Sequence, residues 1–508
     1  MKTNGACAAF KVVAWFAAIS VLGPSFAPAQ LDSSDDVLEG LEAPGSSERP
    51  WRPPDMTGFA EVIKARVEPE ADPQKDYDLA ELIDLAERAN PKTKFAWEQA
   101  KQAAAAVGLA QSEYFPIIAL NASAGYSREP VPVPESATTA GYLDLKTEQA
   151  QPVATLEWVL LDFGRRKSGV IAAKNHLLAA NFGFNARHQE IIFNVQSAFY
   201  EYCKARGRID VAQSALTSAL EVQQAVEERF KNGLATAPDV SQAQQQAASA
   251  TFDLEDVQAK ERDAQVVLAE TIGITPTVPL HVVDFSKLPV PTNLEDTVEQ
   301  VIDRTLKQRP DLMAQVALLR EKEAEVRHAR TAYYPTLAFV GEAGWSFDNS
   351  QMKFAGNELP WSSTQQPVWG AGLSLTWSLF DGGSRKHKLE LAEAEHAAAQ
   401  HALEDSSDEA ISQVWQSYTD TKLAISRLDV ATALVDASEK SYQQTFEAYQ
   451  NGLSSLVDVL SARRELSQAR YTQLDTRATL LESTAALAFT SGDLGRQLLE
   501  RKTWRPEN

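Results

Sequence analysis

Two short and similar segments of the chain each carry one aspartate close to a glycine turn. The segments are NGLATAPDV at 232–240 and NGLSSLVDVL at 451–460, and they place Asp239 and Asp458 at matching positions. An aspartate near the start of a helix can cap its first turn. Aspartates that several chains bring together attract cations and raise one another's pKa. The residues alone leave both kinds of chemistry open for these two positions.

Histidine patterns do not indicate a metal site or a catalytic centre. His387, His396 and His401 lie in one predicted helix at irregular spacings, and the sequence contains neither an HExxH nor a CxxC motif. No set of nucleophile, base and orienting residue can be assembled. We therefore predict a protein that is not an enzyme, with no catalytic residues, no metal and no cofactor.

The two aspartate segments belong to a repeat that covers most of the chain. An offset of 219 residues relates landmark residues of the two halves, among them Pro91 and Pro310, Pro116 and Pro335, Trp158 and Trp377, Asp162 and Asp381, and Gly273 and Gly492. A constant offset of this kind indicates a duplicated structural unit. We predict two tandem copies, 77–273 and 297–492, joined by a Pro-rich connector at 274–296.

Each copy contains two segments with the period-two alternation of a β-strand. The predicted strands are about 117–127, 152–162, 336–346 and 369–380, and a loop of about two dozen residues joins the two strands of each copy. One face is apolar, the other is small or polar, and aromatic residues stand near the ends. Strands of ~10 residues with these properties are typical of a membrane β-barrel, although a half-buried hairpin of a soluble sheet would alternate in the same way.

The longest uninterrupted segments are predicted helices. Between Ser384 and Gln450 there is no proline or glycine, which permits a helix of ~100 Å at ~1.5 Å per residue. Apolar or aromatic residues recur there every seven positions, at Leu428, Val435, Tyr442 and Tyr449, as in a coiled coil. The chain stops near glycines 233 and 452 and resumes as helix, so each copy is expected to form a long helical hairpin.

Four strands cannot close into a barrel, and lipid does not tolerate an unpaired strand edge. Two chains would give 8 strands, whose interior is filled by side chains, whereas three chains would give 12 strands and a lumen. The sequence therefore predicts a mostly α protein with a transmembrane β-barrel. We expect a homotrimer with four strands per chain, and a 12-stranded barrel continued by long α-helical coiled coils.

The ends of the chain are predicted to be separate segments. Residues 1–29 read as a secretory signal peptide with an apolar run at 12–22. Its removal changes the formal charge of the chain from −21 to about −23. So negative a chain is not expected to bind nucleic acid, because binding to phosphate groups needs basic residues. We expect an acidic extension containing Pro and Ser at 30–76 and a tail at 493–508. Cys203 would be the one cysteine left, so no disulfide can form within the mature chain.

Short motifs in both copies, taken in order, resemble the TolC family of outer-membrane efflux proteins. They are QRPDL at 308–312, YYPTL at 333–337, LFDGG at 379–383 and the two NGL segments, and the resemblance covers about residues 76–495. It implies a TolC-like homotrimer in the outer membrane of a Gram-negative-type bacterium. The coiled-coil helices would form a tunnel through the periplasm.

The resemblance also implies a function and its partners. The chain would be the passive exit duct of a tripartite efflux pump for drugs and other toxic small molecules. An inner-membrane transporter of RND or ABC type would supply the cargo, a periplasmic adaptor (membrane fusion) protein would engage the helical tips, and outer-membrane lipid would surround the barrel. Type I protein secretion and metal-ion efflux remain as alternatives. A structural coiled-coil or adhesin protein of the cell envelope is the alternative from another class.

The resemblance assigns roles to residues at the two tips. The residues expected to contact the adaptor are Asn232, Gly233, Leu234, Asn451, Gly452 and Leu453. The pore and gate residues are Asp458, Asp239, Tyr449 and Ser461. Asp458 falls on a ring of aspartates that narrows the entrance, and Ser461 occupies the place of a second aspartate. Asp239 and Tyr449 resemble a carboxylate and a tyrosine that keep the gate shut, but the arginine that the family places two residues after the tip glycine is Ser454 here.

Overall fold

The computed structural model describes residues 75–134, 142–276, 280–283, 288–294, 296–354 and 357–494. The chain divides into two units, Met1–Glu68 and Pro69–Asn508, and all described residues belong to the second. The predicted signal peptide lies outside the described residues. So do the predicted extension up to residue 74 and the predicted tail beyond residue 494.

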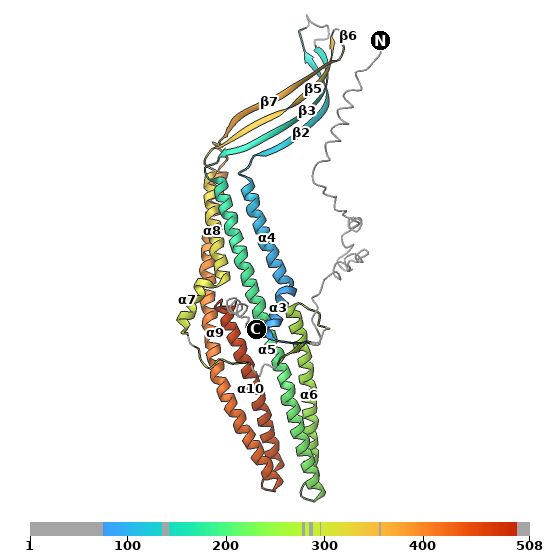
Figure 1. Ribbon diagram of the computed structural model, residues 1–508, viewed down its shortest axis with the longest axis vertical. Helices are drawn as coiled ribbons and strands as arrows, with labels where there is room; N and C mark the ends of the chain where they lie inside the picture. Colours follow the sequence, from blue (N-terminus) through green and yellow to red (C-terminus); the bar gives the residue numbers. More distant parts are fainter. Residues whose placement is uncertain are drawn as a thin grey trace, which may run out of the picture. The chain divides into compact units, whose positions relative to one another are not determined.

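Four long antiparallel strands form one sheet (Figure 1). They are β2 (Ile117–Pro132), β3 (Tyr142–Leu161), β5 (Thr336–Phe354) and β7 (Ser362–Thr376). β3 pairs with β2 and β5, and β5 pairs with β7 and, at its far end, with the short β6 (Asn357–Glu358). Among the described residues, β2 and β7 each pair along one side only, so both long edges of the sheet are open.

The register places most of the large apolar residues of the four strands on one face of the sheet. Leu120 lies opposite Ala154, Ala154 opposite Ala343, and Ala343 opposite Trp369. The large side chains of this face that are exposed in the single chain include Ile118, Leu120, Trp158, Trp345, Trp369, Leu373 and Leu375. This arrangement confirms the predicted alternation and gives the sheet a face suited to lipid.

The strands are longer than the sequence pattern predicts. They contain 16, 20, 19 and 15 residues, and the pairing of β2 with β3 continues to Pro132 and Tyr142 within the segment expected to be a loop. Polar side chains join the two strands in this additional segment, as in the ion pair of Arg128 with Asp144 at 2.6 Å. β7 also ends at Thr376, before the expected end at residue 380. Apolar alternation stops where a strand leaves the lipid zone, so it cannot reveal a polar extension.

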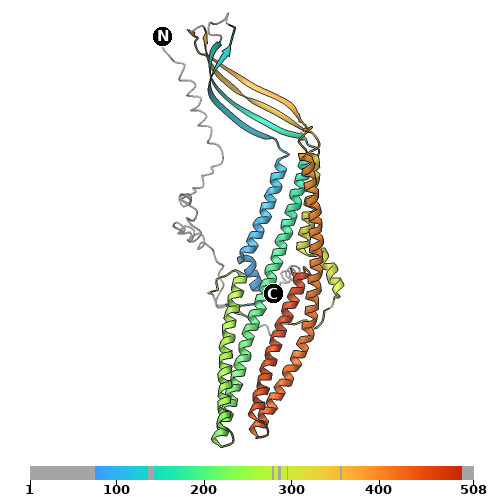
Figure 2. The ribbon, with the colours of Figure 1, turned by 180° about the vertical axis from the view of Figure 1, so that it is seen from behind.

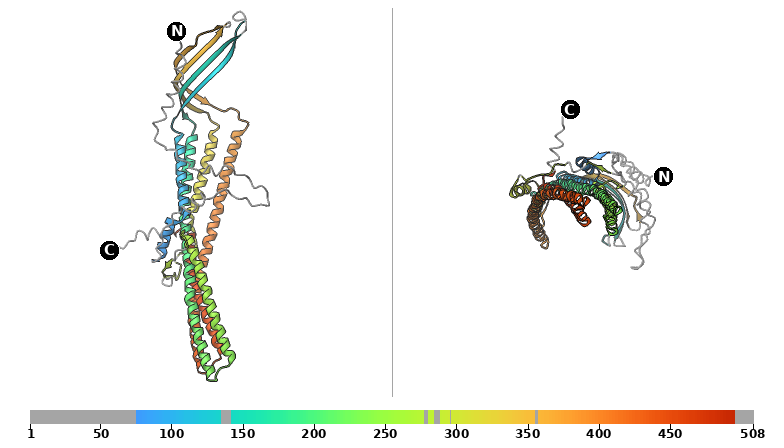
Figure 3. Two further views of the ribbon diagram at one scale, coloured as in Figure 1. Left: turned by 90° about the vertical axis from the view of Figure 1, so that its right-hand side faces the viewer. Right: turned by 90° about the horizontal axis from the view of Figure 1, so that it is seen from below.

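Two long helical hairpins extend from the sheet. In the first, α5 (Arg165–Lys231) turns into α6 (Ala237–Ile272), and in the second, α9 (Ser384–Gln450) turns into α10 (Leu456–Thr490). α5 and α9 each have 67 residues, and α10 packs against α5 as well as against α9. Seen along their axes, the helices lie on a curved wall rather than around a core (Figure 3).

Shorter elements complete each copy. α4 (Pro91–Ser112) packs beside α5, and α8 (Pro310–Thr331) packs between α5 and α9 (Figure 3, left). Midway along the helices lie the remaining elements, α3 (Leu79–Ala89), α7 (Val298–Gln308) and the paired two-residue strands β1 (Asp76–Tyr77) and β4 (His281–Val282).

The junction between strand and helix has the same structure in both copies. The Asp162 carboxylate accepts bonds from the backbone N–H groups of Gly164 (3.2 Å) and Arg166 (3.0 Å) and from the Arg166 guanidinium (2.6 Å). Asp381 binds Gly383 and Arg385 in the same way. Since both arginines also bind carbonyl groups at the strand end, the ion pair fixes where each long helix starts.

Side-chain size changes along α9. Towards the tip, Val435, Tyr442 and Tyr449 of the predicted heptad series are buried, and Leu428 is half-buried. Towards the sheet the buried residues of α9 are smaller: Ala410, Val414, Ser417, Thr421 and Ala424. Small side chains allow neighbouring helices to approach closely, and the large ones near the tip build a separate apolar cluster there.

Candidate functional site

The two hairpin turns form the candidate site, at the end of the helices opposite the sheet (Figures 1 and 2). Gly233 (φ 73°) and Gly452 (φ 77°) adopt the left-handed conformation that ends a helix, so each turn needs its glycine. The leucines that follow, Leu234 and Leu453, are 66% and 83% exposed. The expected adaptor-contacting residues therefore include two apolar side chains that project from tight turns.

Asp458 and Asp239 cap the helices that return from the tips. Asp458 accepts bonds from the Ser455 N–H (3.1 Å) and hydroxyl (2.7 Å), while Asp239 accepts bonds from the Thr236 N–H (2.8 Å) and hydroxyl (2.7 Å). Each set is a capping box that satisfies the first turn of a helix. These bonds hold the pKa of both exposed carboxyl groups below the usual value. In the single chain, then, both aspartates perform the capping role that the sequence left open.

Two serines occupy positions at which the family resemblance calls for charged residues. Ser454, in place of an arginine, donates a bond from its hydroxyl to Asp458 at 3.2 Å. Ser461, in place of a second aspartate, donates to Glu465 at 3.2 Å. Ser454 thus becomes part of the local turn and does not reach the other hairpin.

Tyr449 connects the two hairpins through a residue that the sequence reasoning missed. The Arg229 guanidinium, from the last turn of α5, lies 4.8 Å from the centre of the Tyr449 ring. Its Nη1 donates to the carbonyl oxygens of Tyr449 (2.9 Å) and Gln450 (3.2 Å) at the end of α9. Arg229 therefore bonds one tip to the other.

A difference between the copies could have revealed Arg229. The last turn of α5 carries Arg229 and Lys231, whereas the last turn of α9 has no basic residue. The position 219 residues after Arg229 is Ala448, so this charge is present in one hairpin only.

Tyr449 itself is buried. It belongs to an apolar cluster that also contains Val222 and Val226 of α5 and Leu456 and Val459 of α10. Burial raises the pKa of the Tyr449 phenol, with a smaller opposing effect from Arg229 and a smaller supporting one from Asp239. Within the described residues no hydrogen bond joins Asp239 to Tyr449, because the Asp239 carboxylate is engaged by Thr236.

Two more arginines join the hairpins between the tips and the middle of the helices. Arg463 of α10 is buried and donates to the carbonyl oxygen of Ala215 in α5 and to Gln246 in α6, both at 3.1 Å. Farther from the tips, Arg208 of α5 forms an ion pair with Asp475 of α10 through three hydrogen bonds of 2.7, 2.9 and 3.1 Å. Arg463 and Arg208 thus join α5 to α10, whereas Arg229 joins α5 to the end of α9.

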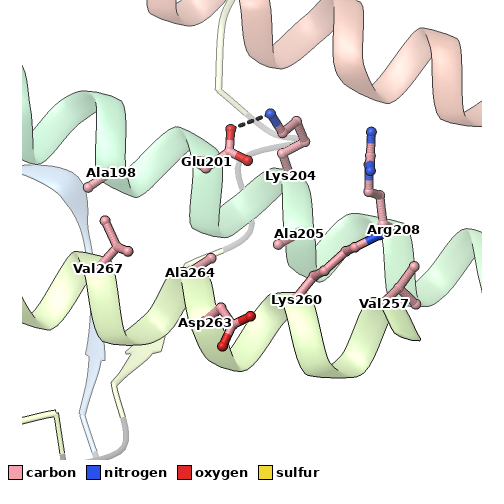
Figure 4. A pocket seen from close by; sticks show the side chains of 10 residues that line it. All are labelled: Ala198, Glu201, Lys204, Ala205, Arg208, Val257, Lys260, Asp263, Ala264 and Val267. Carbon is pink, nitrogen blue, oxygen red and sulfur yellow. Dashed lines mark ion pairs between the residues drawn. The ribbon is translucent and has the colours of Figure 1, made fainter. Parts of the chain in front are cut away.

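A shallow cavity of about 290 Å³ lies between α5 and α6, away from the tips (Figure 4). Alanine and valine side chains form its floor, and charges of both signs surround it, including the ion pair of Glu201 with Lys204. The described residues hold no group of three His, Cys, Asp or Glu side chains placed to bind a metal ion. The helices of the described ranges also include none with the length and hydropathy needed to cross a membrane.

Comparison with known proteins identifies a family. The family model described as "Outer membrane efflux protein" matches residues 82–274 and 301–493, which is more than half of the chain. Among curated relatives, Protein CyaE from Bordetella pertussis is 27% identical, with 88% of this chain and 91% of that protein covered. Outer membrane protein OprJ from Pseudomonas aeruginosa is 25% identical, with 77% and 78% covered.

Solved structures show the same fold. The outer-membrane channel OprN superposes with a TM-score of 0.70 at 21% identity, covering 84% of this chain and 99% of that one. VceC from Vibrio cholerae gives a TM-score of 0.66 at 22% identity, with 82% and 96% covered.

Proposed function

The chain belongs to the outer membrane efflux protein family, and we propose that three copies of it form the exit duct of a tripartite efflux system. The family membership makes it an outer-membrane efflux channel rather than an enzyme. The number of chains, the partners and the cargo are the parts that we propose.

The open sheet is the observation that carries the proposal. It has an apolar face and two long unpaired edges, β2 and β7. Unpaired backbone groups are very unfavourable in lipid, so these edges must be covered. Three sheets joined edge to edge give 12 strands, enough to leave a lumen. The face opposite the apolar one carries Asn121, Thr155 and Glu342, which suits water.

The helical hairpins support a periplasmic connection. Three curved walls of helices would extend the barrel into a tunnel, with six tips at its far end. The exposed Leu234 and Leu453 would offer an apolar contact to an adaptor protein. The duct itself has no energy source, so an inner-membrane transporter must select the cargo and drive its export. We assign small molecules as the cargo, and protein secretion is the competing assignment.

Conductance of the purified protein tests the duct. Reconstituted into planar bilayers, the trimer should give discrete single-channel steps, because a 12-stranded barrel encloses water. Trimer mass is checked in parallel by native mass spectrometry. The proposal would be overturned by a monomeric protein. It would also be overturned by a trimer that inserts into the bilayer but conducts neither as the wild type nor as any of the Arg229 and Tyr449 variants described below.

Cargo is tested in cells that lack the gene. Complementation should restore resistance to several unrelated toxic compounds if the cargo is small molecules. Restored secretion of a protein without a change in resistance would instead assign the duct to protein export.

A further inference from the structure

We infer that Arg229 closes the tunnel mouth by clamping the end of the second hairpin to the first. In this inference the mouth widens only after the Arg229 guanidinium has left the end of α9. The inference rests on the proposed duct, since it assigns a residue to the closing of its entrance.

The contacts of Arg229 fit a clamp on a helix end. The last carbonyl groups of a helix have no partners within the helix and carry partial negative charge. Nη1 of Arg229 binds two of them, those of Tyr449 and Gln450, and the guanidinium also covers the Tyr449 ring. A charged donor held at three points on the other hairpin restrains it in position and in direction.

Burial makes the contact with Tyr449 hard to replace. Tyr449 is 5% exposed, and Nε of Arg229 is buried without a hydrogen-bond partner in the described structure. α9 has no basic residue of its own in its last turn, so the positive charge at its end comes from the other hairpin. Loss of Arg229 would leave the Gln450 carbonyl to water and remove the charged donor from the Tyr449 carbonyl, which would keep its bond from the Gly452 N–H. It would also loosen the Tyr449 ring against α5.

The position of Arg229 makes it the first link to yield. The arginine links between the hairpins involve α5 at residues 208, 215 and 229, and position 229, which is bonded to the end of α9, is the one next to the turn. Arg463 is more deeply buried between the hairpins, and the Arg208–Asp475 pair is closer to the packed middle of the helices. The tip can therefore separate at Arg229 while the two other links hold the hairpins together.

This clamp differs from a gate closed by a tyrosine and a carboxylate. Arg229 uses the ring face and the backbone oxygen of Tyr449 and does not need the phenol hydroxyl. Removal of the hydroxyl alone should therefore leave the mouth closed, whereas a hydroxyl–carboxylate gate would open.

Four single variants test the clamp in the full-length protein. Arg229→Ala removes it, and Arg229→Lys keeps the charge but loses the planar fork. Tyr449→Phe removes the phenol hydroxyl. Lys231→Gln is the matched control, because Lys231 is an exposed cation in the same turn and its side chain forms no hydrogen bond or ion pair with the second hairpin among the described residues. Circular dichroism and trimer mass confirm that each variant is folded.

Two measurements decide the outcome. We expect Arg229→Ala to raise the open probability about tenfold, equivalent to about 1.4 kcal/mol, and Arg229→Lys to raise it nearly as much. Tyr449→Phe and Lys231→Gln should behave like the wild type. Hydrogen exchange of the Gly452 and Leu453 amides, which bond to the end of α9, should accelerate in the two Arg229 variants only.

Unchanged conductance and unchanged exchange in Arg229→Ala would refute the clamp, as would an open mouth in Tyr449→Phe. If wild type and variants all fail to conduct, the proposed duct fails. The exchange experiment in detergent still decides whether Arg229 holds the end of α9.

Discussion

At the scale of single residues, Asp458 shows how one side chain can serve two purposes. Its carboxylate is exposed and satisfies the first turn of α10 through Ser454 and Ser455. A cap needs a hydrogen-bond acceptor, whereas a cation-attracting ring needs a charge. The two roles can therefore be separated by substitutions that remove one property and keep the other.

We expect Asp458→Asn to reduce cation selectivity and block by divalent cations, and to leave the stability of the hairpin nearly unchanged. The amide still accepts a hydrogen bond, but the proposed trimer would lose the three charges that the expected aspartate ring places at its entrance. Bilayer reversal potentials and thermal unfolding measure the two effects.

Ser455→Ala supplies the complementary variant. It removes the capping hydroxyl at a cost of about 1 kcal/mol and keeps the charge, so selectivity should persist while the tip becomes less stable. Full cation selectivity in Asp458→Asn would show that Asp458 is a cap and nothing more.

At the scale of elements, the duplicated copies repeat their contacts as well as their sequence. Gly273 ends α6 with a φ of 92°, and Gly492 follows the end of α10 with a φ of 79°. Each glycine packs against the residue that precedes the first proline of a helix. That residue is Asn90 for Gly273 and Arg309 for Gly492. A Cβ atom at Gly492 would lie 3.1 Å from the Arg309 Cα. Backbone strain and crowding both require glycine there.

Gly492→Ala should therefore destabilise the protein by about 1–3 kcal/mol. Thermal unfolding in detergent measures this change. Gly108→Ala is the matched control, since Gly108 lies within α4 and a Cβ atom there would have no neighbour within 4 Å. The control should be neutral or slightly stabilising, and equal effects of the two substitutions would contradict the assigned role of Gly492.

At the scale of the whole molecule, the repeat predicts how neighbouring chains pair. Ile117 lies opposite Glu157, and the positions 219 residues later, Thr336 and Thr376, are also opposite each other. Thr155 of β3 lies opposite Glu342 of β5. Ser374 is 219 positions after Thr155, and Ser123 is 219 positions before Glu342. The repeat therefore places Ser374 of β7 opposite Ser123 of β2 in the next chain. Internal symmetry thus supplies the register of an interface that a single chain does not contain.

A Ser123→Cys/Ser374→Cys variant in a Cys203→Ser background should form covalent trimers on mild oxidation. Within one chain the two positions are separated by two strands, or ~14 Å, so the bond must join different chains. Denaturing electrophoresis without reductant detects the product. Ser123→Cys/Leu373→Cys should not cross-link, because a shift of one residue puts the second thiol on the other face. Cross-linking in this control alone would rule out the predicted register.

The sequence by itself determined much of this protein. Its constant offset predicted the duplication, its alternation predicted which strand residues share a face, and the break at Gly452 predicted the turn after α9. These features follow from local preferences of the backbone and from periodic burial, which neighbouring residues encode. The family resemblance was also carried by short motifs in order along the chain.

Only the tertiary structure decided the partners of the charged residues. Arg229 and Tyr449 are 220 positions apart, and no local pattern pairs them. The polar extension of β2 and β3 was equally hidden, because hydrogen bonds and ion pairs such as Arg128–Asp144 hold it without apolar alternation. Contacts between distant polar groups depend on how the hairpins pack, and a periodic signal records only which side of an element is buried.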